Sequence, residues 1–322
     1  MSKTENFLRL FPLSFRKLLE NASLELEKVR EIRIRAEKPL LIKIGLEEWT
    51  ISQEGHLSKN YGRGIRISLP EVLEILEYLC GSSIYAYEEE LKKGYLTVQG
   101  GHRIGVCGSV TTEKNLVKTF RYVSSLNIRM AHEIKGAADD IYPYLHENSC
   151  FYNTLLISGP GLGKTTLLRD IVRQASGHGG QHVCVIDERS EIAGCYMGLM
   201  QNDLGMRTDV LDNCLKAEGM MMAVRAMGPD IVAVDEIGSI EDVQAIRTVL
   251  RCGCRIIATV HGETMEDLKQ KPALGMLLKE QVFERYVLLG RKSARISLPE
   301  TETFADCIQK TVLDSAEQVI AL

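Results

Sequence analysis

Apolar residues follow two different rhythms along the chain and divide it into halves. In residues 1–135 helical and strand-like patterns alternate. Apolar residues recur at helical spacing over 5–21, whereas 29–36 alternates apolar and charged positions as a half-buried strand does. Residues 40–45, which follow Pro39, are expected to pair with that strand. The first half is therefore predicted to be a smaller α+β domain.

Two local signals refine this half. Ser68 followed by Glu71 is typical of a capping box, and the helix it begins has its apolar face in 72–79. Residues 94–108 hold two β-rich stretches around a Gly-Gly turn, which predicts a hairpin. Residues 136–148, which contain Pro143, are expected to form a linker or a short connecting helix.

The second half, residues 149–322, has short and nearly continuous apolar runs between helical patterns. The runs occupy 154–158, 183–186, 231–234 and 255–260. Such runs are typical of strands that are buried on both faces of a parallel sheet. We expect an α/β core that binds its ligand at the carboxyl edge of these strands, followed by a divergent tail from about residue 291.

Composition narrows the class of protein. The 322 residues suit two domains, and 39 Lys and Arg against 43 Asp and Glu give a net charge of −4, which disfavours a nucleic-acid coat protein. The nine cysteines include no Cys-X-X-Cys pair, so no zinc site is predicted. The first thirty residues lack the apolar core of a secretory signal, and a cytoplasmic setting is expected.

A glycine-rich loop follows the first strand of the second half. Ser158-Gly-Pro-Gly-Leu-Gly-Lys-Thr-Thr166 precedes a helical pattern, an arrangement whose backbone N–H groups and helix N-terminus bind phosphate. Lys164 is expected to reach the β- and γ-phosphates of ATP, and Thr165 to ligate Mg²⁺. Ser158 stands where the usual pattern has glycine. The residues expected to hold the nucleotide are Gly159, Pro160, Gly161, Leu162, Gly163, Lys164, Thr165 and Thr166.

Polar residues stand at the ends of the other three strands. Asp235 and Glu236 follow the run 231–234, so Asp235 is predicted to hold Mg²⁺, partly through water, and Glu236 to polarise the attacking water. Asp187, Glu188 and Glu191 follow the run 183–186. His261 ends the last strand, where a γ-phosphate sensor is expected.

The order of these motifs resembles the type II and type IV secretion ATPase superfamily. Gly-Lys-Thr-Thr, Ile-Asp-Glu-Arg-Ser-Glu-Ile, Ile-Val-Ala-Val-Asp-Glu and Ala-Thr-Val-His-Gly match its Walker A loop, Asp box, Walker B strand and His box. Lys-Thr-Thr-Leu-Leu-Arg-Asp after the loop and Gly-His-Arg-Ile-Gly-Val-Cys-Gly in the hairpin point to members that act in sporulation. The likeness spans roughly 5–290 and implies a RecA-like P-loop core. Asp235 replaces a glycine that the superfamily often has.

The resemblance also implies roles and partners. Glu236, Glu188, Glu191 and His261 match acidic and His-box catalytic positions, and Arg103 and Arg129 match arginines of the N-terminal domain that approach the phosphates. It implies a hexameric ring that hydrolyses ATP with Mg²⁺. It further implies docking on the membrane components of a secretion-like sporulation channel, peripherally at the inner face of a membrane on the mother-cell side.

Two other classes of function stay open from the residues. A RecA-like core also drives nucleic-acid-dependent ATPases, and residues 29–38 are locally basic. Aromatic residues make up only 6% of the chain, so stacking platforms for single strands are not evident. The third class is a nucleotide-regulated switch with negligible turnover. The motor ATPase is the leading hypothesis.

Overall fold

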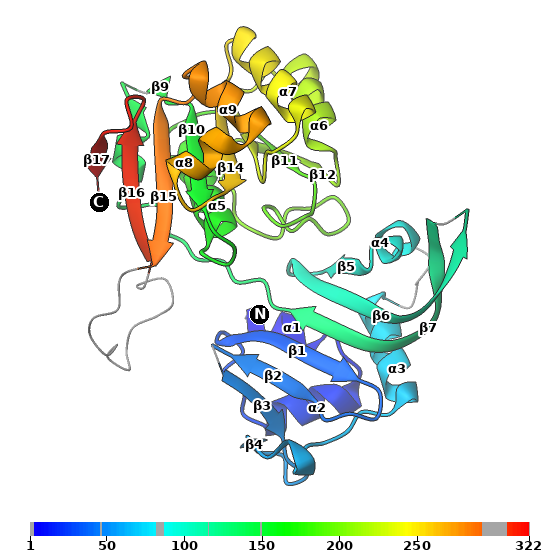
Figure 1. Cartoon of the computed structure of the whole chain (residues 1–322). Helices are drawn as coiled ribbons and strands as arrows, with labels where there is room; N and C mark the ends of the chain where they lie inside the picture. Colours follow the sequence, from blue (N-terminus) through cyan, green and yellow to red (C-terminus); the bar gives the residue numbers. More distant parts are fainter. Residues whose placement is uncertain are drawn as a thin grey trace. The chain divides into compact units, whose positions relative to one another are not determined.

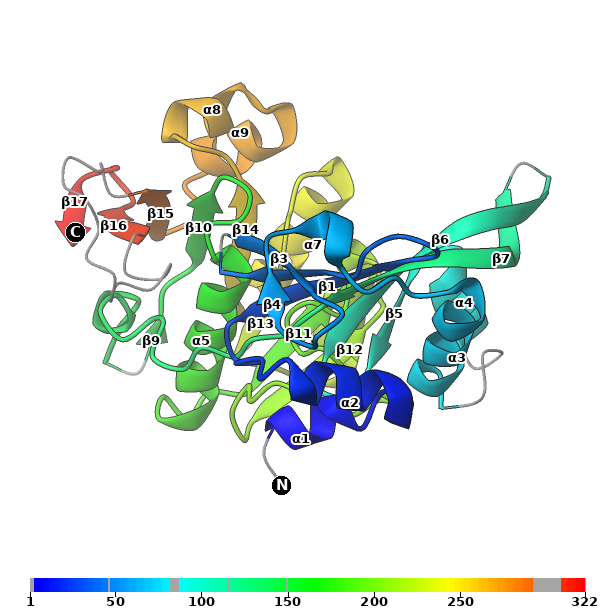
Figure 2. The same ribbon diagram turned by 90° about the horizontal axis from the view of Figure 1, so that it is seen from below.

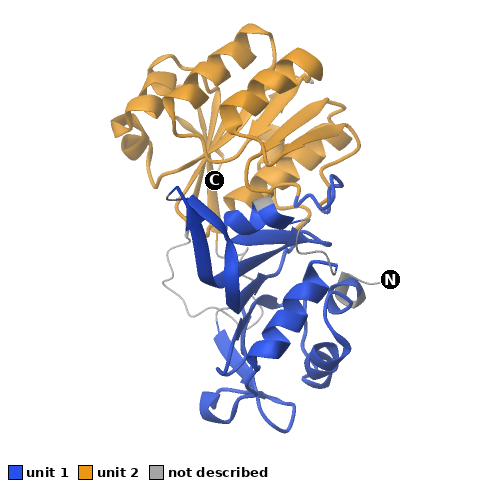
Figure 3. Ribbon diagram, turned by 90° about the vertical axis from the view of Figure 1, so that its right-hand side faces the viewer, with its two compact units in different colours: residues 1–132, 194–201 blue, residues 133–193, 202–322 orange. Residues whose placement is uncertain are grey.

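The computed structural model describes residues 3–45, 47–81, 87–114, 116–148, 150–291 and 308–321. The chain forms two compact units, which Figure 3 colours separately. The first contains residues 1–132 and 194–201, and the second contains 133–193 and 202–322. Of the described residues, no helix is both long and apolar enough to cross a membrane.

An antiparallel sheet of seven strands forms the first unit, in the order β4-β3-β2-β1-β7-β6-β5 (Figure 1). The strands are β1 (Val29–Arg35), β2 (Leu41–Ile44), β3 (Glu47–Ile51), β4 (Leu57–Ser58), β5 (Tyr95–Val98), β6 (His102–Glu113) and β7 (Leu116–Arg129). Along β1, Ile32 and Ile34 are buried while Arg33 is exposed. The predicted pairing of 29–36 with 40–45 is confirmed, as is the hairpin around the Gly-Gly turn.

Helices cover the apolar face of this sheet. They are α1 (Lys3–Leu8), α2 (Leu13–Asn21), α3 (Leu69–Leu79) and α4 (Glu88–Lys92), with a 3-10 turn η1 (Tyr61–Arg63). The capping box predicted at Ser68 and Glu71 is present at the start of α3. The prediction of one helix over 5–21 is wrong. Pro12 caps a second helix there, because proline lacks the N–H that a continuing helix needs.

The second unit contains a mainly parallel sheet in the order β12-β11-β13-β14-β10-β15-β16-β17. Its strands are β10 (Thr154–Ser158), β11 (Val183–Asp187), β12 (Thr208–Asp212), β13 (Ile231–Val234), β14 (Arg255–His261), β15 (Arg285–Arg291), β16 (Ile308–Asp314) and β17 (Val319–Ala321). The four predicted strands are adjacent and parallel, as expected. Strands β16 and β17 extend the sheet antiparallel, so the described part of the C-terminal tail, residues 308–321, belongs to this fold.

Helices lie on both faces of the parallel sheet. They are α5 (Lys164–Gly177), α6 (Lys216–Ala226), α7 (Ile240–Arg251), α8 (Met265–Gln270) and α9 (Pro272–Lys279). Alternate strand residues such as Leu155 and Ile186 share a core with α6, α7 and α9, while α5 packs on the opposite face. The carboxyl ends of β10, β11, β13 and β14 therefore meet at one edge, where ligands bind in sheets of this kind.

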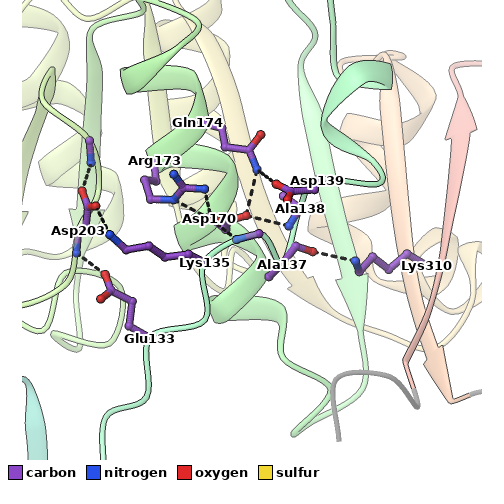
Figure 4. Close-up of polar contacts among 12 residues, drawn as sticks. Glu133, Lys135, Ala137, Ala138, Asp139, Asp170, Arg173, Gln174, Asp203 and Lys310 are labelled. Atoms are coloured by element: carbon purple, nitrogen blue, oxygen red, sulfur yellow. Dashed lines mark hydrogen bonds and ion pairs between the residues drawn. The ribbon is translucent and has the colours of Figure 1, made fainter. Parts of the chain in front are cut away.

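Residues 136–138, at the start of the second unit, are hydrogen-bonded to Asp170 of α5 (Figure 4). Both carboxylate oxygens of Asp170 accept backbone N–H groups, from Gly136 at 3.2 Å and Ala138 at 2.8 Å. Arg173 pairs with the same carboxylate at 2.7 Å. Lys310 of β16 holds the segment from its other side through the carbonyl of Ala137 at 2.7 Å. Residues 136–148 then contain a 3-10 turn, η3 (Tyr142–Tyr144), and the strand β8 (His146–Glu147), which pairs with β9 (Cys150–Phe151).

Candidate nucleotide-binding site

The glycine-rich loop lies between buried β10 and the first turn of α5. Gly161 and Gly163 have φ angles of +74° and +81°, a region that residues with a Cβ rarely occupy. Gly163 caps α5, so the positive end of the helix begins where the loop closes. All eight residues predicted to hold the nucleotide, 159–166, belong to this loop and first turn. The local fold suits a phosphate cradle.

Lys164 is the cation of this cradle. Its side chain is buried, and its Nζ has no hydrogen-bond partner among the described residues. Burial lowers the pKa of the ammonium group, although the nearby carboxylates of Asp235 and Glu236 act in the opposite direction. A buried ammonium without acceptors is costly, and a phosphate oxygen would satisfy it.

Asp235 connects the loop to the strand β13. One of its carboxylate oxygens accepts a hydrogen bond of 2.9 Å from the hydroxyl of Thr165, and the other accepts one from the hydroxyl of Thr259. A hydroxyl beside a carboxylate is the donor set that P-loop proteins offer to Mg²⁺. Thr165 and Asp235 therefore fit the metal predicted for them.

Glu236 is held by groups from several strand ends. Its carboxylate lies 2.8 Å from Nε2 of His261 and 3.1 Å from the guanidinium of Arg189. Burial favours the neutral acid, but these two groups and Lys164 outweigh it and lower the pKa of Glu236. The carboxylate is thus ionised at neutral pH. Glu236 also has a φ of +56°, and its N–H donates to Thr259 at 2.9 Å.

Asp187 organises the loop that follows β11. Its buried carboxylate accepts the backbone N–H groups of Glu191, Ile192 and Ala193 at 2.8–3.0 Å. Burial raises its pKa to about 6, even though these hydrogen bonds act in the opposite direction. Asp187 shapes this loop through its backbone contacts, a role that the sequence alone did not indicate.

The same loop presents Glu188 and Glu191 toward the strand ends. Glu188 pairs with Lys216 of α6 at 2.5 Å. A polar pocket brings these side chains together with the Walker B acids, and its lining residues are Asp187, Glu188, Arg189, Glu191, Lys216, Asp235 and Glu236. Five of the seven were singled out from the sequence. Arg189 and Lys216 were not, although Arg189 lies within the quoted Asp-box motif.

Arg103 and Arg129 lie in the first unit. They are direct cross-strand neighbours on β6 and β7, and the guanidinium of Arg103 stacks 3.7 Å from the ring centroid of Tyr95. Arg129 is exposed. The two arginines therefore share one face of the sheet, the face opposite its apolar core.

The comparisons with known proteins agree with this geometry. The family model described as "Sporulation stage III, protein AA" matches residues 1–297. The chain belongs to the sporulation stage III protein AA family. Stage III sporulation protein AA of Bacillus subtilis (strain 168) is 42% identical to it over 274 residues, which cover 82% of this chain and 83% of that relative. The predicted resemblance to proteins that act in sporulation is confirmed.

Two solved structures share the fold of this sporulation stage III protein AA family member. The Legionella pneumophila ATPase DotB matches with a TM-score of 0.60 and 15% identity, over 95% of this chain and 82% of that one. The pilus retraction motor PilT, solved with bound ADP, matches with a TM-score of 0.52 and 14% identity, again over 95% and 82%. The predicted P-loop core with a preceding N-terminal domain is confirmed.

Proposed function

We propose that this protein is a Mg²⁺-dependent ATPase that uses hydrolysis to drive assembly of, or transport through, a membrane channel during sporulation. The observation that carries the proposal is the buried ammonium of Lys164 within a glycine-rich loop. It has no acceptor among the described residues, and it lies near two acids that end a strand. A triphosphate and its metal ion supply the missing acceptors and neutralise those acids.

Hydrolysis needs a base or water-orienting group, and Glu236 is our candidate. His261 and Arg189 fix its two carboxylate oxygens. Glu188 and Glu191 line the same pocket and support it as polar neighbours. When bound, Mg²⁺ would neutralise charge on the phosphates, and Thr165 and Asp235 would hold it. Two structural neighbours support ATP as the nucleotide, since DotB is an ATPase and PilT was solved with bound ADP.

We further propose a ring of six copies in which Arg103 and Arg129 supply positive charge to the phosphates. Phosphoryl transfer spreads negative charge over the equatorial oxygens, and an added arginine is worth about 10³–10⁵ in rate. The paired placement of the two arginines on adjacent strands supports this role. The working protein would lie in the cytoplasm, on the mother-cell side, held at the membrane by channel components.

The test measures ATP binding and phosphate release by the full chain and by Lys164→Ala. We expect the variant to keep its fold and lose both. Arg103→Ala and Arg129→Ala should bind ATP normally but hydrolyse it more slowly, while Arg33→Ala, an exposed arginine on β1 of the same sheet, serves as the control. Wild-type turnover by folded Lys164→Ala would refute the ATPase. Stimulation by single-stranded nucleic acid would instead favour the nucleic-acid-dependent class.

A further inference from the structure

Strands β6 and β7 continue beyond the rest of the first unit's sheet as a two-stranded arm, residues 109–114 and 116–122 (Figures 1 and 2). The pairing of β6 with β5 ends at Gly105, and the pairing of β7 with β1 ends at Ser125. Past these residues the two strands pair with each other as far as Glu113 and Leu116. The arm is thus a projecting part of the first unit.

Three bulges give the arm one apolar face. The register shifts between Cys107 and Gly108, between Ser109 and Val110, and between Thr111 and Thr112, so β7 advances three residues for every two of β6. Every second residue of β6 faces the same side. The β7 partners on that side are Leu126, Val123, Phe120 and Val117, an apolar residue at every third position. The bulges therefore keep the apolar residues in one row.

The residues of this row are buried near the body of the sheet and exposed to solvent farther along the arm. Leu126 and Val123 are buried, whereas Val110 and Val117 farther out are 41% and 38% exposed. Leu116, at the end of the arm, is 73% exposed, but it pairs with Glu113 and therefore faces the opposite side from the row. A sheet's apolar face is normally covered along its length, and an exposed continuation marks a surface that contacts something else.

Cations outnumber carboxylates in the arm. The arm carries Lys114, Lys118 and Arg121 against one carboxylate, that of Glu113, in a chain whose net charge is −4. Glu113 pairs with Lys118 at 2.8 Å. The charge of the arm complements an anionic surface.

We propose that the arm inserts the outer part of its apolar row, formed by Val110, Phe120 and Val117, into the interfacial layer of a bilayer that contains anionic lipid. A stable protein interface buries about 1,200 Å² or more, and so short a ribbon offers only a few exposed apolar side chains. Insertion into lipid needs no matching partner surface, and apolar burial combined with electrostatic attraction suffices for peripheral binding. The inference does not depend on the proposed ATPase activity.

The experiment is flotation of the full chain with vesicles of phosphatidylcholine alone or mixed with phosphatidylglycerol. We expect binding to the anionic vesicles that salt weakens. Val110→Asp combined with Val117→Asp should lower the vesicle partition coefficient by about tenfold or more, because both residues face the side of the apolar row and both charged groups would enter the apolar layer. Lys114→Glu should lower it by about fivefold or more. Leu199→Asp is the matched control, since Leu199 is 70% exposed elsewhere in the same unit, and it should bind as the wild type does.

Insertion itself has a spectroscopic signature. The chain contains one tryptophan, Trp49, so Val117→Trp in a Trp49→Phe background places a single reporter on the apolar row of the arm. Its emission should shift to the blue on anionic vesicles and be quenched by brominated lipid. Equal binding to neutral and anionic vesicles, or undiminished binding by the double Asp variant, would overturn the proposal. So would a double Asp variant that loses self-association while its vesicle binding is unchanged, because the arm would then contact a second copy.

Discussion

Nε2 of His261 lies 2.8 Å from Oε1 of Glu236, so the ends of two adjacent parallel strands, β14 and β13, share a hydrogen bond. Arg189, which follows the neighbouring strand β11, pairs with the other carboxylate oxygen at 3.1 Å. The backbone of Glu236 has a φ of +56° and donates to Thr259. Strained backbone of this kind persists where its surroundings hold it in place and is concentrated at functional sites.

Replacing Glu236 separates binding from hydrolysis. Glu236→Gln keeps the shape of the side chain and removes its charge and basicity. We expect ATP to bind normally and to be hydrolysed about 10²–10⁴-fold more slowly. Single-turnover phosphate release at saturating ATP measures this. Glu218→Gln, at an exposed acid in the first turn of α6, is the control. Normal turnover per bound nucleotide would remove Glu236 from catalysis.

His261 should determine, through its hydrogen bond with Glu236, the pH at which activity falls on the acid side of the pH–rate profile. The hydrogen bond with His261 helps to lower the pKa of Glu236 below its usual 4.5. His261→Ala removes that help, so the pKa should rise and activity should fall at a higher pH than in the wild type. The measurement is kcat/KM against pH. An unchanged acid limb, together with a lower plateau, would mean that His261 acts on the nucleotide rather than through Glu236.

The buried ammonium of Lys164 should lower the free energy of unfolding of the protein when no nucleotide is bound. Lys164→Met removes a buried charge without a hydrogen-bond partner and keeps an unbranched chain, so the free energy of unfolding without nucleotide should rise by about 1–2 kcal/mol. Lys216→Met should instead lower the free energy of unfolding, because Glu188 would lose its ion-pair partner at 2.5 Å. Chemical denaturation of both variants without nucleotide tests the pair. A destabilised Lys164→Met protein would contradict the argument.

Much of the candidate site could be predicted because its residues are adjacent in sequence to buried strands. Four apolar runs defined four parallel strands, and the polar residues after each run meet at one edge as a consequence. The placement of Asp235 beside Thr165 follows from the sheet order, in which β14 lies between β10 and β13.

Other features depend on contacts that no local pattern encodes. Thr259 lies inside a buried apolar run, so its two hydrogen bonds to the Walker B residues were not predicted. Asp170 belongs to the Lys-Thr-Thr-Leu-Leu-Arg-Asp motif, but the hydrogen bonds that it accepts from Gly136 and Ala138 depend on tertiary packing. The helix over 5–21 was misjudged because apolar residues keep a helical spacing through the break at Pro12. The segment 194–201 belongs to the first unit although its neighbours in sequence belong to the second.

Thr259 should act as a positioning residue for the Walker B acids. Thr259→Val removes the hydroxyl that donates to Asp235 and accepts from the N–H of Glu236. We expect the free energy of unfolding to fall by about 1–3 kcal/mol. Nucleotide binding should also need a Mg²⁺ concentration about 10–100-fold higher than in the wild type. Thr259→Ser keeps the hydroxyl and should restore the Mg²⁺ response. Equal Mg²⁺ titrations for Val and Ser variants would show that only packing matters.

The carboxyl of Asp187 should make stability depend on pH in an unusual direction. Burial raises its pKa from 3.8 to about 6. A raised pKa means that the folded protein holds the proton more tightly, so this group's contribution is fully present below pH 3.8 and is lost as pH rises through about 6. Relative to Asp187→Asn, the wild-type free energy of unfolding should therefore fall by up to about 3 kcal/mol between pH 4 and 7.

Asp170 provides the control of opposite sign. Burial raises the pKa of its carboxyl, but hydrogen bonds from Ala138, Arg173, Gln174 and Gly136 outweigh burial and lower it below 3.8. Its contribution is present above pH 3.8 and is lost only as pH falls through the folded value. The difference between wild type and Asp170→Asn should thus be flat from pH 5 to 7, where the Asp187→Asn difference changes. Urea unfolding at each pH measures both. A flat Asp187→Asn difference would mean that the three backbone N–H groups keep that carboxylate ionised despite its burial.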